Sequence, residues 1–208
     1  MKNILIHGLG QDEKAWNKVI EELNDVSVGC PNLFSLVKSE DMNYKKLYEA
    51  FSSYCNNKEK KLNLCGLSLG GILAIDYAKQ YPDKVNSLII IGTPYEIPKK
   101  LFKLQNIVFK FMPKSTFTKM GCEKKSFIEL VNSMADLDIK SNLDKIECKT
   151  LILCGENDKS NLESSRLLYE HIKDSELEII ENSSHEANID NPKELAKIIC
   201  KFWEETEI

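Results

Sequence analysis

Short apolar runs recur along the chain, and most of them end in glycine or a small polar residue. The clearest runs cover residues 3–8, 26–30, 62–66, 87–92, 150–155 and 177–183. They are rich in Ile, Leu and Val, and they lack the alternation of polar and apolar positions that is typical of a strand with one solvent-exposed face. This pattern predicts strands of a parallel sheet that is covered on both faces.

Between these runs, apolar residues recur at helical spacing over residues 13–23, 43–54, 69–80, 161–172 and 192–204. Asn191, Pro192 and Glu194 have the residue types that open a helix, and they precede the last of these segments. Strand and helix therefore alternate along most of the sequence. The alternation predicts an α/β domain with a mostly parallel sheet of about six strands and helices on both faces.

One interval interrupts this alternation. Between Pro94 and about Ile139 no run is typical of a strand, although two stretches are typical of helices. A connection this long inside a compact domain is usually functional or forms a small subdomain. We therefore predict that residues 1–94 and 140–208 form the core and that residues 95–139 form a helical cap or lid.

Within the predicted cap, residues 99–112 mix bulky apolar side chains with four lysines, Lys99, Lys100, Lys103 and Lys110. A basic amphipathic helix of this kind is compatible with binding to a membrane surface. We favour a lid over membrane binding. In that interpretation the apolar face covers the substrate and the lysines face water.

Composition excludes several classes of function. Hydrophobic content of 42%, charged content of 29% and a formal net charge of −4 are ordinary for a globular protein and give no argument for nucleic-acid binding. Arg166 is the only arginine, which argues against a phosphate site built on arginine pairs.

The seven cysteines are scattered and include no C-x-x-C pair, so neither a zinc site nor a disulfide framework is indicated. The sequence indicates no other metal or cofactor. No apolar run is long enough for a membrane span, and the N-terminal run is too short for a signal peptide. A cytoplasmic protein is the simplest expectation, and nothing indicates an oligomeric state.

The segment GLSLGG, residues 66–71, contains three of the nine glycines and sets Ser68 between two of them. If a strand precedes this segment and a helix follows it, Ser68 lies at the apex of a very sharp turn. Gly66 and Gly70 then allow the strand and the helix to approach each other closely. The turn directs the Ser68 hydroxyl out of the sheet and places the N–H of Leu69 at a helix N-terminus, where it can face a developing anion.

A serine hydroxyl is a weak nucleophile until a base removes its proton, and the base needs a third group to orient it. The chain has three histidines. His7 follows the first strand directly, and His171 lies among charged residues on a predicted helix. His185 lies in a loop after the last apolar run, at the same edge of the sheet as Ser68, and is the candidate base.

Asp158 is the candidate for the orienting carboxylate, because it lies in the loop directly after the strand that ends at residue 155. Its neighbour Glu156 is the main alternative. Asp138, Asp144 and Asp190 are weaker candidates because none of them directly follows a strand.

A second N–H donor is needed for an oxyanion, and the sequence HGLG, residues 7–10, offers one after the first strand. The N–H of Leu9 could point into the same space as that of Leu69. An ordinary turn would use Gly8 and Gly10 equally well.

Together, the sequences HGLG, GLSLGG, GEND and SSHE resemble the α/β-hydrolase superfamily in the order nucleophile, acid and histidine. The resemblance covers essentially the whole chain. It implies that Ser68 is the nucleophile, Asp158 the acid and His185 the base, with Leu9 and Leu69 as backbone donors of the oxyanion hole. It also implies acyl transfer through a serine-bound acyl intermediate that water cleaves.

The sequence departs from the superfamily pattern in two places. It starts at what would be the third strand of the full fold, so we expect a reduced sheet. In addition, the residues before His185 are Asn-Ser-Ser, whereas many relatives have a glycine-rich turn there.

Three functions stay open after the sequence is read. The HG-x-G turn and the small cap are most similar to carboxylesterases, so the first hypothesis is hydrolysis of small-molecule carboxylic esters. The second is hydrolysis of acyl thioesters with the same three residues. The third is a non-catalytic ligand-binding protein of the same fold.

Overall fold

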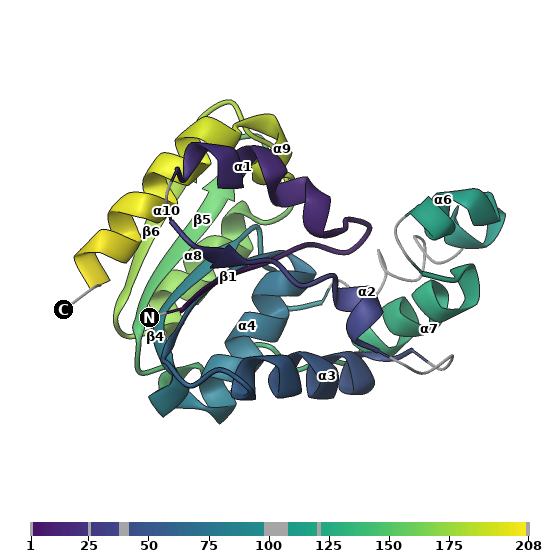
Figure 1. Cartoon of the computed structure of the whole chain (residues 1–208), viewed down its shortest axis with the longest axis horizontal. Helices are drawn as coiled ribbons and strands as arrows, with labels where there is room; N and C mark the ends of the chain where they lie inside the picture. Colours follow the sequence, from purple (N-terminus) through teal and green to yellow (C-terminus); the bar gives the residue numbers. More distant parts are fainter. Residues whose placement is uncertain (1, 25, 38–41, 98–107, 120–121, 207–208) are drawn as a thin grey trace.

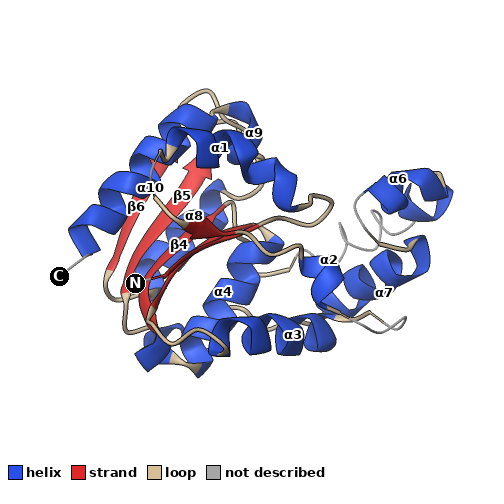
Figure 2. Cartoon of the chain, in the orientation of Figure 1, coloured by secondary structure: helices blue, strands red, loops and turns tan. Residues whose placement is uncertain are grey.

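The computed structural model describes residues 2–24, 26–37, 42–97, 108–119 and 122–206 (Figure 1). Its centre is a sheet of six strands in the order β2-β1-β3-β4-β5-β6, and every neighbouring pair is parallel (Figure 2). The strands are β1 (Lys2–Ile6), β2 (Val28–Gly29), β3 (Leu62–Leu67), β4 (Val85–Ile91), β5 (Lys149–Gly155) and β6 (Ser175–Ile180). The predicted number and direction of strands are confirmed.

Two hydrophobic clusters lie on opposite faces of this sheet. Ile4, Leu64 and Ile90 point to one face, where they pack under α3 (Tyr44–Asn56), α4 (Leu69–Gln80) and α8 (Leu162–His171). Leu5 and Ile89 point to the other face, which α1 (Asn17–Glu22) and α10 (Pro192–Thr206) cover. Successive residues of the central strands alternate between two apolar clusters, so most of their side chains are apolar. The edge strand β6 is an exception, because its Glu176 and Glu178 alternate with apolar residues and are exposed.

The helical expectations differ from the structure in detail. Residues 13–23 form a 3₁₀ turn, η1 (Glu13–Trp16), followed by the short helix α1. Asp12 caps this turn through a hydrogen bond from the Lys14 N–H to its side chain. Two four-residue helices, α2 (Leu33–Leu36) and α9 (Ala187–Asp190), were not predicted, because a single turn is too short to show periodicity. Further short 3₁₀ turns are η2 (Pro82–Lys84) and η3 (Leu143–Lys145).

The interval predicted to form a cap contains α6 (Lys114–Lys119) and α7 (Lys124–Met134), which lie together at one end of the molecule (Figure 1). Phe117 and Phe127 from these helices belong to the same buried cluster as the α3 and α4 face of the sheet. Residues 98–107, which include Lys99, Lys100 and Lys103, lie outside the described residues.

Candidate active site

Ser68 lies between the last residue of β3 and the first residue of α4. Its backbone φ of 52° and ψ of −110° are unusual for a residue with a side chain, and such a conformation persists only where the surroundings enforce it. The Ser68 N–H donates to the Ile91 carbonyl at 2.8 Å, which anchors the turn to the end of β4. The sharp turn predicted from the sequence is therefore present.

Glycine is required on both sides of this turn because backbone atoms leave no room for a side chain. A Cβ on Gly66 would lie 2.3 Å from the Gly70 carbonyl oxygen, and a Cβ on Gly70 would lie 2.3 Å from the Ile6 carbonyl oxygen. Both distances are far below van der Waals contact. These contacts explain the spacing of the glycines and also bring the start of α4 against the end of β1.

The turn that contains Leu9 is held against the Ser68 turn. Gly8 lies beside Leu67, since a Cβ on Gly8 would be 3.3 Å from the Leu67 side chain. The Gly8 carbonyl accepts hydrogen bonds from the Gln11 N–H at 3.3 Å and from His7 Nδ1 at 3.0 Å. In a trans peptide the N–H of Leu9 points away from the Gly8 carbonyl, so these two bonds fix the direction of the Leu9 N–H.

His7 is fully buried, and both of its ring nitrogens have partners. Nε2 accepts from the Leu33 N–H at 3.0 Å, so Nδ1 carries the proton that it donates to the Gly8 carbonyl. Burial lowers the pKa of His7 and keeps its ring neutral. With both nitrogens engaged, His7 has none left to act as a base and instead supports the turn before Leu9.

Asp158 and His185 are hydrogen-bonded, with 2.8 Å between His185 Nδ1 and Asp158 Oδ2. The Asp158 side chain is only 2% exposed, whereas that of His185 is 43% exposed. Asn161 Nδ2 donates to both Asp158 oxygens, at 3.0 and 2.9 Å. Because Nδ1 gives its proton to Asp158, the 3.2 Å contact between Asn161 Nδ2 and His185 Nδ1 is not a further hydrogen bond. This arrangement leaves Nε2 of His185 free of a proton in the neutral ring.

The pKa values of this pair are shifted in opposite directions. The hydrogen bond to Asp158 raises the pKa of His185 against the effect of burial, and the charges of Asp158 and Glu186 raise it further. Burial alone would raise the pKa of Asp158, but the hydrogen bonds from His185 and Asn161 outweigh it and lower that pKa. Asp158 is therefore ionised near neutral pH and can stabilise a protonated His185.

Ser68 lies next to Ile91, and His185 lies next to Gly92, the following residue. Ile91 accepts the Ser68 N–H, and a Cβ on Gly92 would lie 3.1 Å from both His185 Nδ1 and Asp158 Oδ2. Among the described residues no hydrogen bond joins the Ser68 hydroxyl to His185. Sequence reasoning used Gly92 only as the end of a strand. Its φ of 52° and the space that its missing side chain leaves for the His185 ring give it a larger role.

The loop before His185 can pack closely on β5 because Gly155, the last residue of that strand, has no side chain. A Cβ on Gly155 would lie 2.1 Å from the Ser184 carbonyl oxygen, so the end of β5 packs directly on this loop. Asp190 accepts a hydrogen bond from the Ser184 N–H at 2.7 Å and a second from the Ser184 hydroxyl. These contacts hold the loop although its Asn-Ser-Ser sequence contains no glycine.

The alternative residues point elsewhere. Glu156 is exposed and accepts from the Asn182 N–H at 3.1 Å. Asp138 accepts from the Ser141 N–H at 3.1 Å, and Asp144 lies in the turn η3. His171 is exposed on α8. None of these four residues contacts His185 or the Ser68 turn through a hydrogen bond in the described part of the chain.

Comparisons with known proteins show which proteins this chain is similar to. A family model described as serine aminopeptidase, S33, matches residues 37–129, a stretch shorter than half of the chain that includes Ser68. Mouse monoacylglycerol lipase ABHD6 is 25% identical over 255 residues, which cover 96% of this chain and 74% of that protein.

Two solved structures show the same fold along nearly the whole length. An esterase from Thermogutta terrifontis has a TM-score of 0.83 and 21% identity, covering 100% of this chain and 91% of that one. The enol-lactonase from Burkholderia xenovorans LB400 has a TM-score of 0.85 and 15% identity, covering 98% and 91%. The chain has the α/β-hydrolase fold, and its sequence is similar to members of the α/β-hydrolase superfamily.

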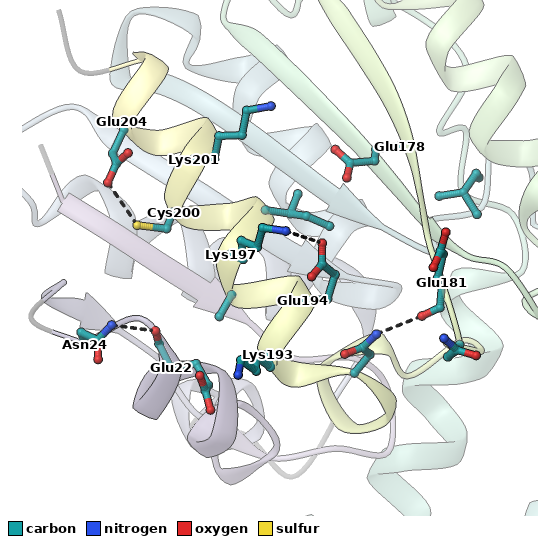
Figure 3. A pocket seen from close by; sticks show the side chains of 15 residues that line it. Glu22, Asn24, Glu178, Glu181, Lys193, Glu194, Lys197, Cys200, Lys201 and Glu204 are labelled. Atoms are coloured by element: carbon teal, nitrogen blue, oxygen red, sulfur yellow. Dashed lines mark hydrogen bonds and ion pairs between the residues drawn. The ribbon is translucent and has the colours of Figure 1, made fainter.

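A charged groove lies apart from the predicted site. It has a volume of about 840 Å³ and runs between α1, α10 and β6 (Figure 3). Lys197 pairs with Glu194 at 3.3 Å in it, and Glu22, Glu178 and Lys201 line it as well. None of the five predicted site residues lines this groove.

Two further features of the hydrolase concern metals and membranes. No group of three or more His, Cys, Asp or Glu side chains among the described residues could hold a metal ion. Within the same residues, no helix has the length and apolar character that crossing a bilayer requires.

Proposed function

We propose that this α/β hydrolase cleaves carboxylic esters of small molecules through an acyl-serine intermediate, with Ser68, Asp158 and His185 as its catalytic residues. The observation that carries the proposal is the hydrogen bond between His185 and Asp158. It fixes the ring so that the proton lies on Nδ1 and the free nitrogen, Nε2, can accept a proton. The relatives known as esterases and lipases support an ester as the substrate.

In the first half of the reaction, Ser68 Oγ attacks the ester carbonyl carbon and gives its proton to His185 Nε2. The carbonyl oxygen becomes an oxyanion, which the N–H groups of Leu9 and Leu69 stabilise by hydrogen bonds. His185 then donates the proton to the alcohol oxygen as the carbon–oxygen bond breaks. Asp158 stays ionised throughout and balances the charge on the protonated ring.

In the second half, water attacks the acyl-serine carbonyl and gives one proton to His185 Nε2. The acid leaves when His185 returns this proton to Ser68 Oγ. The site thus regains its starting state, and neither step needs a metal or a redox partner. Apart from water and the substrate, each donor and acceptor in the cycle is a side chain or an amide named above.

A row of aromatic rings supports an apolar acyl group. Phe34 lies 5.8 Å from the His7 ring and 6.3 Å from Phe127, measured between ring centroids. Phe127 in turn packs against Phe109 at 5.1 Å and Phe117 at 5.2 Å. The row connects the turn before Leu9 with the helices of residues 95–139, which we propose to form the lid over the acyl chain.

Labelling with a fluorophosphonate, followed by mapping of the modified peptide, tests this proposal. We expect the adduct on Ser68 and no adduct in Ser68→Ala. Ser53→Ala is the matched control, because Ser53 is exposed on α3, and it should label like the wild type. Labelling at another serine would contradict the proposal.

A panel of p-nitrophenyl esters and acyl thioesters of graded chain length distinguishes the two chemistries. Faster turnover of the esters supports the proposal, and faster turnover of the thioesters favours the thioesterase. A protein that neither labels nor turns over any member of the panel would be the non-catalytic binding protein.

A further inference from the structure

The side chain of Gln11 lies between two loops that are 177 residues apart in the sequence. It is 8% exposed, and its amide makes four hydrogen bonds. The oxygen accepts from the Gly8 N–H at 3.3 Å and from Asn188 Nδ2 at 3.2 Å. The nitrogen donates to Glu186 Oε1 at 2.8 Å and to Asn188 Oδ1 at 3.3 Å.

These bonds use the full capacity of the amide, which has two acceptor sites and two donor hydrogens. Asn188 is completely buried and returns a bond to Gln11, so the two amides form a reciprocal pair. Asn188 also donates to the Ala15 carbonyl at 3.1 Å. A buried polar group that loses its partner is costly, so this network has one strongly preferred arrangement.

One end of this network is the turn that carries Leu9. The Gly8 carbonyl is held by His7 and by the Gln11 backbone, and the Gly8 N–H is held by the Gln11 side chain. Both peptide planes next to Gly8 are therefore fixed, and the Leu9 N–H belongs to the second of them.

The other end of the network is the loop of the candidate base. Glu186 directly follows His185, and Asn188 lies in α9, which begins one residue after Glu186. A shift of Gln11 would therefore move the Leu9 turn relative to the His185 ring. Even a small displacement matters, because misplacing a catalytic group by about 1 Å can reduce the reaction rate by about 100-fold.

We propose that Gln11 is a positioning residue that fixes the position of the Leu9 turn relative to the His185 loop. The inference rests on the proposed function, in which these two loops supply an oxyanion donor and the base. Gln11 itself does not touch the reacting atoms. Its contribution is to keep two loops from opposite ends of the chain at one fixed separation.

A charge-swap experiment tests this role. In Gln11→Glu, the new carboxylate can still accept from Gly8 and Asn188, but it can no longer donate to Asn188 Oδ1 or to Glu186, and it repels Glu186. We expect kcat for an ester to fall by about 10- to 100-fold with little change in KM. The double variant Gln11→Glu/Glu186→Gln restores the bond between positions 11 and 186 with donor and acceptor exchanged, although the bond to Asn188 Oδ1 stays lost, and kcat should rise at least about 3-fold above that of the single variant.

Two controls separate positioning from a general loss of structure. Gln80→Glu makes the same replacement at an exposed glutamine that accepts from the Tyr48 hydroxyl, and it should leave kcat unchanged. All variants are assayed well below their unfolding temperatures. Wild-type kcat in Gln11→Glu, or a double variant no better than the single one, would overturn the proposal.

Amide NMR spectra keep this test independent of catalysis. Gln11→Glu should shift the resonances of Gly8–Leu9 and of Glu186–Asn188 together, and the double variant should restore both sets. Shifts confined to one loop would overturn the inference even if the enzyme is active. If both sets of resonances shift together but the protein hydrolyses no ester, the role of Gln11 in positioning the two loops is supported and the proposed function is wrong.

Discussion

The turn around Ser68 and the loop around His185 lie at the same edge of the sheet, but different interactions hold them. Around Ser68 the backbone packs on itself, and the glycines at 66 and 70 leave no space for a methyl group. Around His185, Asp158 accepts a hydrogen bond from the ring and Asp190 accepts one from the Ser184 N–H, and the loop backbone also packs closely on Gly155.

The difference predicts how each region responds to substitution. A Cβ added at Gly66 or Gly70 would lie 2.3 Å from a backbone oxygen, and this clash cannot relax without moving a strand or a helix, so a new side chain in the Ser68 turn disturbs the whole fold. A side-chain hydrogen bond can be removed while the backbone stays in place. Substitutions of the polar side chains that hold His185 should therefore reduce activity in steps and spare the fold.

The largest effect is expected for Gly70→Ala. Its Cβ would lie 2.3 Å from the Ile6 carbonyl oxygen, and the free energy of unfolding should fall by about 3 kcal/mol or more. Ester hydrolysis should be lost as well. Chemical denaturation measures the first effect and a p-nitrophenyl ester assay the second.

Gly29→Ala is the control for this substitution. The added Cβ would meet only the Tyr54 hydroxyl, at 2.9 Å, and that hydroxyl is the movable end of a long side chain. The free energy of unfolding should change by less than about 1 kcal/mol. Equal destabilisation in both variants would show that the Ser68 turn is no more tightly packed than the edge strand β2.

The next largest effect is expected for Asp158→Asn. Without the carboxylate, the His185 ring is no longer held with its proton on Nδ1, and kcat should fall by about 10³- to 10⁴-fold while the fold is kept. Asp138→Asn removes an exposed carboxylate whose partner is the Ser141 N–H, and it should leave kcat unchanged. Wild-type activity in Asp158→Asn would assign the orienting role to another group.

The pH dependence should report on the His185 region alone. A base must be unprotonated, so kcat/KM should rise with pH through the pKa of His185. Because Asp158 and Glu186 raise that pKa, the midpoint should lie above the ordinary histidine value of about 6.5.

Glu186→Gln removes one of these negative charges and should move the midpoint to lower pH. Glu178→Gln removes a charge from β6, in the groove away from the site, and should not move it. A flat profile between pH 5 and about pH 8 would be inconsistent with a histidine base.

The smallest effect is expected for Asn161→Ala. This change removes the donor that serves both oxygens of Asp158, so the pKa of Asp158 rises and its hold on His185 weakens. We expect kcat to fall by about 10-fold. Asn157→Ala, at an exposed position in the same loop, should be neutral. A larger loss of kcat in Asn161→Ala than in Asp158→Asn would contradict the proposal that Asn161 acts through Asp158.

Much of the fold could be predicted because its cause is local in the sequence. An apolar run such as residues 62–67 is covered on both faces and needs no partner to be identified. The turn at Ser68 was predictable for the same reason, since three glycines within six residues indicate that the strand and the following helix pack closely together.

Other features could not be predicted because their causes lie far apart in the chain. The pair of Gln11 and Asn188 joins residues 177 positions apart, and neither has an unusual sequence neighbourhood. Asn161 was part of a predicted helix, and nothing in that pattern indicated that its amide would hold Asp158. Gly92 ended a predicted strand, and a glycine at that place could have suggested that another segment packs closely against it. Nothing in the sequence identified His185 as that neighbour.

A crystal structure of the fluorophosphonate adduct tests the central claim most directly. We predict phosphorus bonded to Ser68 Oγ, with its oxygen about 3 Å from the N–H groups of Leu9 and Leu69 and with His185 Nε2 facing the bonded Oγ. An adduct on Ser68 whose oxygen points away from both amides, or a His185 ring turned away from Oγ, would contradict the account.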